Sequence, residues 1–332
     1  MRAWPFDPDV DRREARLAPS ARRLLLADTR RIVIVGAGGW IGRTVIALLH
    51  EALGARAFAE RVVCFGSRAN TLDVDDGLCV QVRPLADLVG LEHTPTLLLH
   101  LAFLTKDRVG RMSTDDYVRA NRALSQTVLG GLDAIGVDRL FVASSGAAAF
   151  ADDELAAPDL RLYGGLKRDD EQVFADWARA EPEARRTVIA RIYSVSGPWI
   201  NQQDVYALAG LILDALAERP VEVRAPMRVW RSYVAVREVV SLAVAALLAK
   251  NEPTVLRFDT GGAALELGEV GARVAEVFGA EALRRPVTDP TDNRYVGDDA
   301  AYAALLRRHD VAHLPLTEQI VETAAYLARC AP

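Results

Sequence analysis

The segment "RIVIVGAGGWIG" (31–42) constrains the fold more than any other part of the chain. A short β-branched run is followed by Gly36, Gly39 and Gly42 and then by the helical pattern "RTVIALLHEAL". The first glycine permits a sharp turn, the second lets backbone N–H groups approach a pyrophosphate, and the third lets helix and strand pack closely. The N-terminus of a helix also favours an anion. The segment therefore predicts a strand, a tight turn and a helix that bind a dinucleotide.

Further strand patterns alternate with helical patterns along the first two thirds of the chain. They occur at 61–67, 79–85, 96–103, 139–146 and 187–194, and the longest helical pattern covers 114–136. Such alternation implies crossover connections and a mostly parallel sheet with both faces covered. Ligands bind beyond the carboxyl ends of such strands. We therefore expect an α/β fold, a Rossmann-type doubly wound parallel sheet, with a smaller mixed C-terminal substrate lobe.

The pattern loosens after residue 200, which suggests a division of the chain. Residues 1–30 are expected to form an N-terminal arm, in which Ser20 would cap a short helix. Residues 31–200 are expected to form the NAD(P)-binding domain, to which segments around 231–262 return. Residues 201–332 would be mainly a substrate-binding lobe, with helices at 203–218, 236–250, 266–279 and 316–329.

The end of the second strand bears on the choice of cofactor. An acidic residue at this position favours the ribose 2′-hydroxyl of NAD, whereas an arginine favours the 2′-phosphate of NADP. The sequence here is "CFGSRAN", in which Ser67 and Arg68 follow the strand and no carboxylate is present. This pattern favours NADP(H) over NAD(H).

The segment "RLYGGLK" (161–167) places Tyr163 four residues before Lys167. Only three of the 40 basic residues other than histidine are lysines, so chance would place a tyrosine and a lysine at this spacing roughly 0.07 times. On a helix these positions share a face. A phenol with a pKa near 10 becomes a useful acid or base at neutral pH when a cation stabilises its phenolate. The strand end "VASSG" supplies Ser144 and Ser145, and the two glycines would let a ligand approach this face of the helix.

Six segments, in this order, resemble the extended short-chain dehydrogenases/reductases, the NAD-dependent epimerase/dehydratase family. They are "GAGGWIG", "LLHLAF", "VRANRALSQTVL", "LFVASSG", "YGGLK" and "ARIYSVSGP". The resemblance covers roughly residues 30–330. It implies hydride transfer to or from C4 of a nucleotide-linked sugar, as in a 4-ketoreductase or a 4-epimerase.

The resemblance also implies roles for individual residues. Tyr163 would be the acid/base, Lys167 its electrostatic partner and Ser145 the group that holds the substrate oxygen. Asn121 would match the family's helix asparagine or be a structural residue of its helix. The expected substrate contacts are Ser145, Gly146, Ser194 and Arg231. The expected cofactor contacts are Gly36, Gly39, Trp40, Ile41, Gly42, Ser67, Arg68, Leu85, Leu101, Ala102 and Phe103, with Tyr163 and Lys167.

Departures from the family pattern narrow the reaction. Family 4,6-dehydratases carry an Asp-Glu pair after the catalytic hydroxyl residue, where this chain has Gly146 and Ala147, so dehydration is not expected. Ser194 replaces an asparagine that normally contacts the substrate. These changes leave hydride transfer intact but leave open a reductase of a non-sugar carbonyl compound. A dinucleotide-binding regulator without catalysis is a separate alternative, against which the intact Ser145, Tyr163 and Lys167 argue.

Composition excludes several classes of protein. The net charge of −5 gives no general attraction to nucleic acid or to an anionic membrane, and no apolar run approaches 18 residues. The three cysteines and five histidines show no metal-ligand spacing. We therefore expect a cytoplasmic protein without a metal site. Its expected partners are a small molecule, of the nucleotide-diphosphate-sugar kind, and, from the resemblance, a second copy of the chain.

Overall fold

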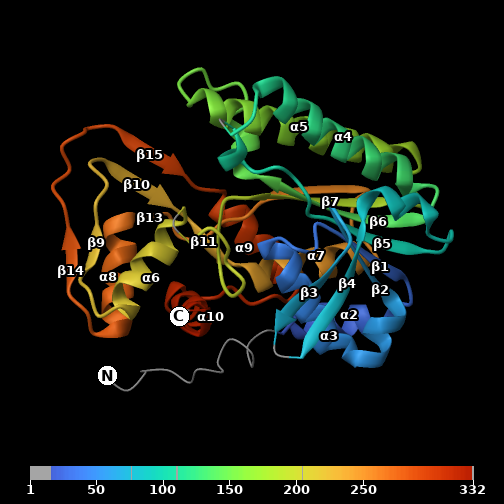
Figure 1. Ribbon diagram of the computed structural model, residues 1–332, viewed down its shortest axis with the longest axis horizontal. Coiled ribbons are helices and arrows are strands. Elements are labelled where there is room, and N and C mark those ends of the chain that lie inside the picture. Colours follow the sequence, from blue (N-terminus) through green and yellow to red (C-terminus); the bar gives the residue numbers. More distant parts are fainter. Residues whose placement is uncertain (1–15, 76, 110, 204, 331–332) are drawn as a thin grey trace.

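The computed structural model describes residues 16–75, 77–109, 111–203 and 205–330 and is built around one large sheet (Figure 1). All neighbouring strands in it are parallel except β3 and β4, which are antiparallel. The strand order places β1 between β2 and β5, so the direction of winding changes at the strand that carries the glycine turn. This confirms the expected fold class. The order is β12 (Val255–Asp259), β7 (Arg186–Ile192), β6 (Val137–Ser145), β5 (Thr96–His100), β1 (Arg31–Val35), β2 (Val62–Gly66), β4 (Leu78–Pro84) and β3 (Asn70–Asp75).

Helices cover both faces of this sheet. The buried side chains of β1 alternate, since Ile32 and Ile34 pack into one core and Val33 and Val35 into the other. Figure 1 shows α4 and α5 above the sheet and the remaining helices of this unit below it. The upper pair is α4 (Thr114–Leu132) and α5 (Pro158–Ala180), and the lower set is α2 (Pro19–Ala27), α3 (Trp40–Arg61) and α7 (Val236–Leu248).

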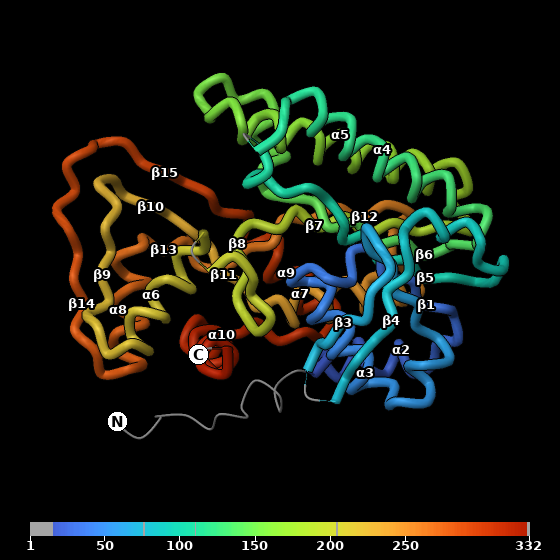
Figure 2. Tube along the Cα trace, viewed as in Figure 1, coloured from blue at the N-terminus to red at the C-terminus, as the bar shows by residue number. Residues whose placement is uncertain are grey.

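A smaller lobe of mixed structure stands beside the carboxyl ends of the strands (Figure 2). A three-stranded sheet and a two-stranded sheet pack there against α6 and α8, while the short pair β8 and β11 lies at the junction with the large unit. The lobe contains α6 (Ala207–Leu216), β9 (Val221–Val223), β10 (Arg228–Arg231), β13 (Leu265–Glu266), α8 (Leu267–Phe278), β14 (Ala282–Arg284) and β15 (Asp292–Tyr295). The junction strands are β8 (Ser194–Ser196) and β11 (Tyr233–Ala235), and the chain ends with α9 (Asp299–Arg308) and α10 (Leu316–Cys330).

The structure corrects several local expectations. Ser20 does not cap α2, because the helix begins at Pro19 after an Ala18 cap, and the Ser20 hydroxyl donates to the carbonyl of Asp310. The antiparallel strand β3 and the helix α9 were not expected. The other C-terminal helices lie within two or three residues of the expected limits, apart from the start of α6. The first half of the N-terminal segment expected as an arm, residues 1–15, lies outside the described residues.

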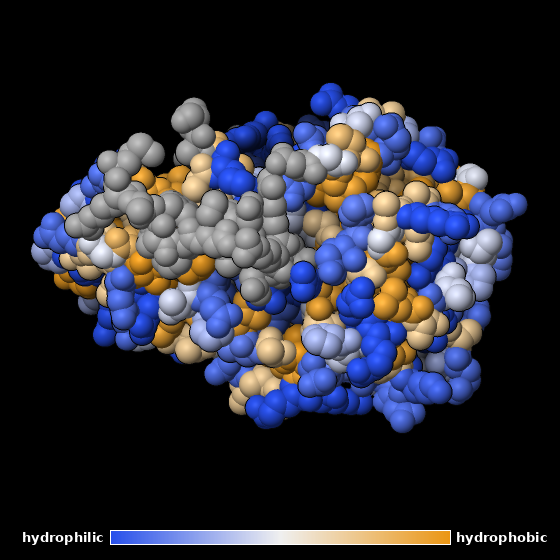
Figure 3. Space-filling view, turned by 90° about the horizontal axis from the view of Figure 1, so that it is seen from below, coloured by the Kyte–Doolittle hydropathy of each residue, from blue (hydrophilic) through white to orange (hydrophobic). Residues whose placement is uncertain are grey.

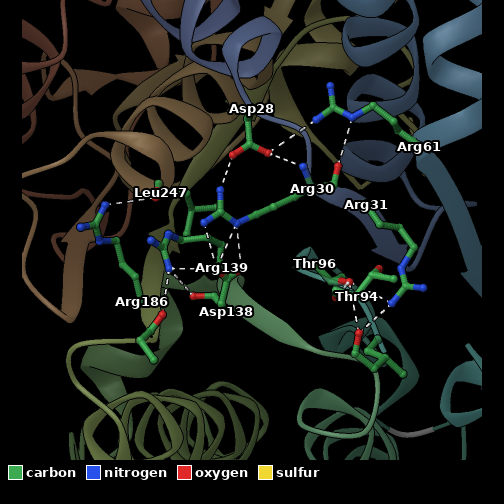
Figure 4. A network of polar contacts seen from close by, with 12 residues as sticks. Asp28, Arg30, Arg31, Arg61, Thr94, Thr96, Asp138, Arg139, Arg186 and Leu247 are labelled. Carbon is green, nitrogen blue, oxygen red and sulfur yellow. Dashed lines mark hydrogen bonds and ion pairs between the residues drawn. The ribbon is translucent and has the colours of Figure 1, made fainter. Parts of the chain in front are cut away.

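Arginines gather at the amino ends of the strands, the opposite end of the sheet from the glycine turn (Figure 4). Arg30 donates to both carboxylate oxygens of Asp138, each at 2.8 Å. Arg186 donates to backbone carbonyls at the end of α7, including that of Leu247 at 3.1 Å. Because these guanidinium groups satisfy carboxylates and helix carbonyls, a structural role accounts for this cluster.

In the described part of the chain, no helix is both long and apolar enough to cross a bilayer. Among the same residues, no three histidine, cysteine or acidic side chains are grouped so that they could hold a metal ion. On the face drawn in Figure 3, hydrophobic residues are interspersed with charged and polar ones.

Candidate active site

A cleft of about 480 Å³ lies between the carboxyl ends of the sheet strands and the smaller lobe. The glycine turn after β1 forms one wall, and the end of β6 and one face of α5 form another. The smaller lobe and the loop before α6 complete it. Of the residues predicted from the sequence, the cleft is lined by Gly36, Gly39, Trp40, Ile41, Gly42, Leu101, Phe103, Ser145, Tyr163, Lys167, Ser194 and Arg231.

The glycine turn has the backbone geometry that a dinucleotide requires. Gly36 has a φ of +97°, and a Cβ atom there would lie 2.7 Å from the backbone nitrogen of Ala102. A Cβ atom at Gly42 would lie 2.3 Å from the carbonyl oxygen of Gly36. Glycine is therefore needed at both positions for strand, turn and helix to approach one another. No side chain caps the N-terminus of α3, which leaves its first N–H groups without a side-chain acceptor, so these residues fit a pyrophosphate.

A second cavity, also of about 480 Å³, continues from the other side of the glycine turn. It shares Gly36, Gly39, Leu101 and Phe103 with the cleft. Its remaining lining includes the other predicted cofactor contacts, Ser67, Arg68, Leu85 and Ala102. Because they share these lining residues, the two cavities adjoin at the glycine turn.

Tyr163 and Lys167 lie on the same face of α5 and both line the cleft. Lys167 is 4% exposed, and its ammonium donates to the carbonyl of Ala143 at 2.7 Å. The ammonium also lies 3.9 Å from the centre of the Phe103 ring. Burial raises the pKa of the Tyr163 phenol, an effect that the nearby Ser145 hydroxyl opposes. Burial lowers the pKa of Lys167 to about 8, although Asp170 and Glu171 favour its charged form.

Ser144 and Ser145 both end β6, but their hydroxyl groups have different partners. Ser144 donates to the buried carboxylate of Glu171 at 2.6 Å, which Arg191 also binds. Ser145 Oγ accepts from the backbone N–H of Ala147 and lies 3.0 Å from the hydroxyl oxygen of Tyr295. Ser145 is thus the hydroxyl that remains at the cleft surface for a ligand oxygen.

The two glycines between Tyr163 and Lys167 lie in different surroundings, and only one of the two positions requires glycine. A Cβ atom at Gly164 would lie 2.1 Å from the carbonyl oxygen of Ala147, because the turn after β6 rests directly on the helix. A Cβ atom at Gly165 would meet nothing within 4 Å. The expectation that the glycines admit a ligand is therefore corrected for Gly164. Gly164 admits the backbone of the segment that follows Ser145.

This difference predicts opposite effects of the same substitution. Gly164→Ala is expected to lower the free energy of unfolding by about 2–4 kcal/mol, because α5 and the 147–148 backbone must separate. Gly165→Ala, at the adjacent position, is expected to raise it by about 0.5–1 kcal/mol through helix propensity. Urea denaturation of both variants measures the difference. Equal effects at the two positions would contradict this explanation of the glycine pair.

The predicted substrate contacts are only partly brought together. Ser194 and Arg231 line the cleft, and Arg231 donates to the side chain of Asn293 while its guanidinium lies 5.9 Å from the centre of the Tyr295 ring. Gly146 is buried and does not line the cleft. A Cβ atom there would lie 2.5 Å from the ring of Tyr193, so its role is to let that ring approach.

Asn121 has a structural position in this structure. Its side-chain oxygen accepts from the backbone N–H of Leu104 at 2.8 Å, and its amide donates to the carbonyl of Tyr117. It therefore ties α4 to the loop after β5, the loop that carries Phe103.

Two tyrosines at the site were not indicated by the sequence: Tyr206, which lines the cleft, and Tyr295, whose hydroxyl group meets Ser145. Tyr295 comes from β15 of the smaller lobe and packs against Tyr193, with ring centres 4.8 Å apart. Tyr206 lies beside Trp40, which follows the glycine turn. The indole N–H of Trp40 donates to the carbonyl of Pro198. Neither tyrosine lies in a motif, so only the packing of the lobe could reveal them.

The geometry agrees with comparisons to known proteins. A solved structure of "MoeE5 in complex with UDP-glucose and NAD" is 21% identical, has a TM-score of 0.67, and the match covers 90% of this chain and 99% of that chain. UDP-glucose 4-epimerase from Thermotoga maritima is 19% identical, with a TM-score of 0.67 and coverage of 90% and 99%. UDP-N-acetylglucosamine 4-epimerase from Methanobrevibacter ruminantium M1 is 14% identical, with a TM-score of 0.68 and coverage of 92% and 100%. At these identities the likeness establishes the fold. No curated protein matches the sequence.

The doubly wound sheet and its glycine turn define a dinucleotide-binding enzyme of the extended short-chain dehydrogenase type. The model of the "NAD dependent epimerase/dehydratase family" matches residues 32–257, about two thirds of the chain. The chain belongs to this family.

Proposed function

We propose that the protein transfers a hydride to or from C4 of a nucleotide-linked sugar, as a 4-ketoreductase or a 4-epimerase. The observation that carries the proposal is that one cleft holds the Ser145 hydroxyl, the Tyr163 phenol and the Lys167 ammonium together with the glycine turn. Proteins of similar fold include UDP-sugar 4-epimerases, two of them solved with a UDP-sugar. The proposal places cofactor binding in residues 31–200 with the returning segments, and sugar binding mainly in 201–332.

The residues would divide the chemistry between them. A bound nicotinamide would supply or accept the hydride. Tyr163 would give a proton to the C4 oxygen or remove one from it, and Ser145 would hold that oxygen by a hydrogen bond. Lys167 would favour the phenolate form of Tyr163 through its charge. In the same cleft, Arg231 would bind the diphosphate, for which the planar guanidinium fork is suited.

Substrate binding would also displace an internal contact. The hydroxyl of Tyr295 now lies where a sugar oxygen would meet Ser145, at 3.0 Å from Oγ. Arg231 lies over the ring of the same tyrosine. A diphosphate drawn to Arg231 would therefore bind next to the residue that must move.

Turnover measurements test the function. A panel of UDP- and dTDP-linked sugars, incubated with NADPH or NAD, is expected to give a C4 product that chromatography identifies. A reductase consumes NADPH in proportion to product, whereas an epimerase interconverts sugars without net consumption. Tight cofactor binding with no change in any nucleotide sugar, together with NADPH-dependent reduction of simple ketones, would favour the non-sugar alternative instead.

The proposed cofactor is NADP(H), because Arg68 would bind its 2′-phosphate. Arg68 is exposed in the second cavity, next to Ser67 and at the end of β2. In Arg68→Glu, the loss of a charge-assisted contact to the 2′-phosphate is expected to weaken NADPH binding by about 10- to 100-fold. NADH binding should change less than about threefold. Fluorescence titration with the two cofactors gives the ratio.

Arg56→Glu is the matched control, since Arg56 is a well exposed arginine on α3 that is paired with Glu60 and lines neither cavity. It makes the same change in net charge. An unchanged ratio of NADPH to NADH affinity in Arg68→Glu, or an equal loss in both variants, would argue against a 2′-phosphate at this site.

The resemblance to the family also supports a homodimer. Sedimentation of the purified protein would give its mass directly, and a monomer at micromolar concentration would remove this part of the proposal.

A further inference from the structure

The Lys167 ammonium is a buried cation that forms no ion pair among the residues that the structure describes. Its hydrogen bond goes to a neutral group, the carbonyl of Ala143. The carboxylates nearest in sequence have other partners, since Asp170 accepts from Ser125 and Glu171 binds Ser144 and the guanidinium groups of Arg191 and Arg257. Within the described chain, no carboxylate forms an ion pair with Lys167. A buried charge without an ion-paired carboxylate is costly, and a further group that faces the ammonium would help to stabilise it.

The face of the Phe103 ring is in position to do so. The ring centre lies 3.9 Å from Nζ, well within the distance of about 6 Å over which an aromatic face attracts a cation. Desolvation strengthens this attraction, and Lys167 is almost completely buried. Phe103 also meets the edge of the Tyr163 ring, with centres 5.7 Å apart and planes at 73°. One side chain thus contacts both Tyr163 and Lys167.

We propose that Phe103 is a positioning residue: its ring face holds the Lys167 ammonium in its charged form and its packing on Tyr163 fixes the spacing of the two. This inference rests on the proposed function, because it assigns Phe103 a part in tuning the same acid/base. The loop after β5 carries Phe103, and the contact of Asn121 with Leu104 fixes that loop. The ring is therefore held from a segment that is separate from α5.

The other groups around Lys167 also affect its pKa, which the ring of Phe103 would raise. From α5, Asp170 and Glu171 favour the charged lysine, while burial lowers its pKa to about 8. From β5, the buried ring of His100 lies 3.6 Å from Asp170, and burial lowers the pKa of His100 so that the neutral imidazole is favoured. From β7 and β12, Arg191 and Arg257 are bound to Glu171 and reduce its effect. Removal of the aromatic face is expected to lower the pKa of Lys167 further.

The small number of lysines makes this pKa directly measurable. With lysine labelled at ¹³Cε, the chain gives three side-chain signals, and the signal missing in Lys167→Met identifies Lys167. Phe103→Leu is expected to lower the pKa of Lys167 by about one unit, since the interaction with a desolvated cation is lost. Phe103→Tyr, which keeps the aromatic face, should stay within about 0.3 units. Lys106 and Lys250 should not shift in either variant.

The pH dependence of kcat gives a second measurement, which would not change if Phe103 had only a structural role. The high-pH decline of kcat should shift down with the pKa of Lys167 in Phe103→Leu and return in Phe103→Tyr. An unchanged Lys167 pKa in folded Phe103→Leu overturns the inference. If that variant does not fold, Phe103→Met provides the same comparison with a flexible side chain of similar volume. The titration needs no substrate, so absence of turnover in the wild type would count against the proposed function and not against the contact of Phe103 with Lys167.

Discussion

Replacing Tyr163 by phenylalanine is expected to lower kcat for the proposed reaction by about 10²- to 10⁴-fold, the range that general acid–base catalysis contributes. The phenol lines the cleft beside Ser145, and no other described tyrosine shares a helix face with Lys167. Phenylalanine keeps the ring that packs on Phe103 and removes only the hydroxyl group. Cofactor affinity and thermal stability should therefore change little, and steady-state kinetics with a nucleotide sugar measures the loss.

Tyr326→Phe is the matched control for this substitution. Tyr326 lies on α10 and does not line the cleft, so removal of its hydroxyl should leave kcat within about twofold. A Tyr163→Phe variant that binds cofactor normally and retains more than about a tenth of the wild-type kcat would show that the acid/base is another group. Tyr295, on Ser145, would then be the next residue to test.

Replacing Lys167 by methionine is expected to abolish most activity and to stabilise the fold. The activity should fall by about 10²-fold or more, because the phenolate of Tyr163 loses its cation. The free energy of unfolding at pH 7 should rise by roughly 1–3 kcal/mol, since a buried charge with a depressed pKa is removed at the expense of one hydrogen bond. Guanidinium denaturation and a turnover assay measure the two effects in the same preparation.

The pH dependence gives the sign of the stability effect. Burial lowers the pKa of Lys167 from 10.5 to about 8. Below pH 8 both the folded and the unfolded chain hold the proton, and the folded state bears the full cost of the buried charge. Between pH 8 and 10.5 the unfolded chain binds more protons, so the free energy of unfolding due to this group rises with pH. The advantage of Lys167→Met over the wild type should therefore shrink from pH 7 to pH 10.

Lys106→Met is the control for charge and composition, because the Lys106 side chain is half exposed and forms an ion pair with the exposed Asp159. It should change stability by less than about 0.5 kcal/mol at either pH. If Lys167→Met were destabilised at pH 7 to the extent of a core deletion, the ammonium would be a net stabilising group, and the account of its environment would be wrong.

The local features of the site were predictable because they depend on near neighbours in the chain. Gly36 and Gly42 follow a β-branched strand, and the backbone at a tight turn determines that glycine must stand there. Tyr163 and Lys167 share a helix face because an α-helix repeats every 3.6 residues. The parallel sheet followed from the alternation of strand and helix patterns.

Other features depended on contacts that no local pattern encodes. The antiparallel strand β3 was missed because its alternation is short, with only Leu72 and Val74 buried. Gly164 was attributed to a ligand because the approach of the Ala147 carbonyl depends on how the turn after β6 packs on α5. The sequence predicted that Lys167 and Tyr163 share a helix face, but not that the ring of Phe103 contacts Lys167, because Phe103 lies on the loop after β5.

The amino-acid order alone thus determined the strand–turn–helix unit, the class of fold and the helix face that carries a phenol and an amine. Only the tertiary structure decided what meets that face, namely Phe103 on the lysine and Tyr295, 150 residues along the chain, on Ser145. The physical reason is that backbone geometry repeats over a few residues, whereas contacts between distant segments depend on how the smaller lobe and the loops pack against the sheet as a whole.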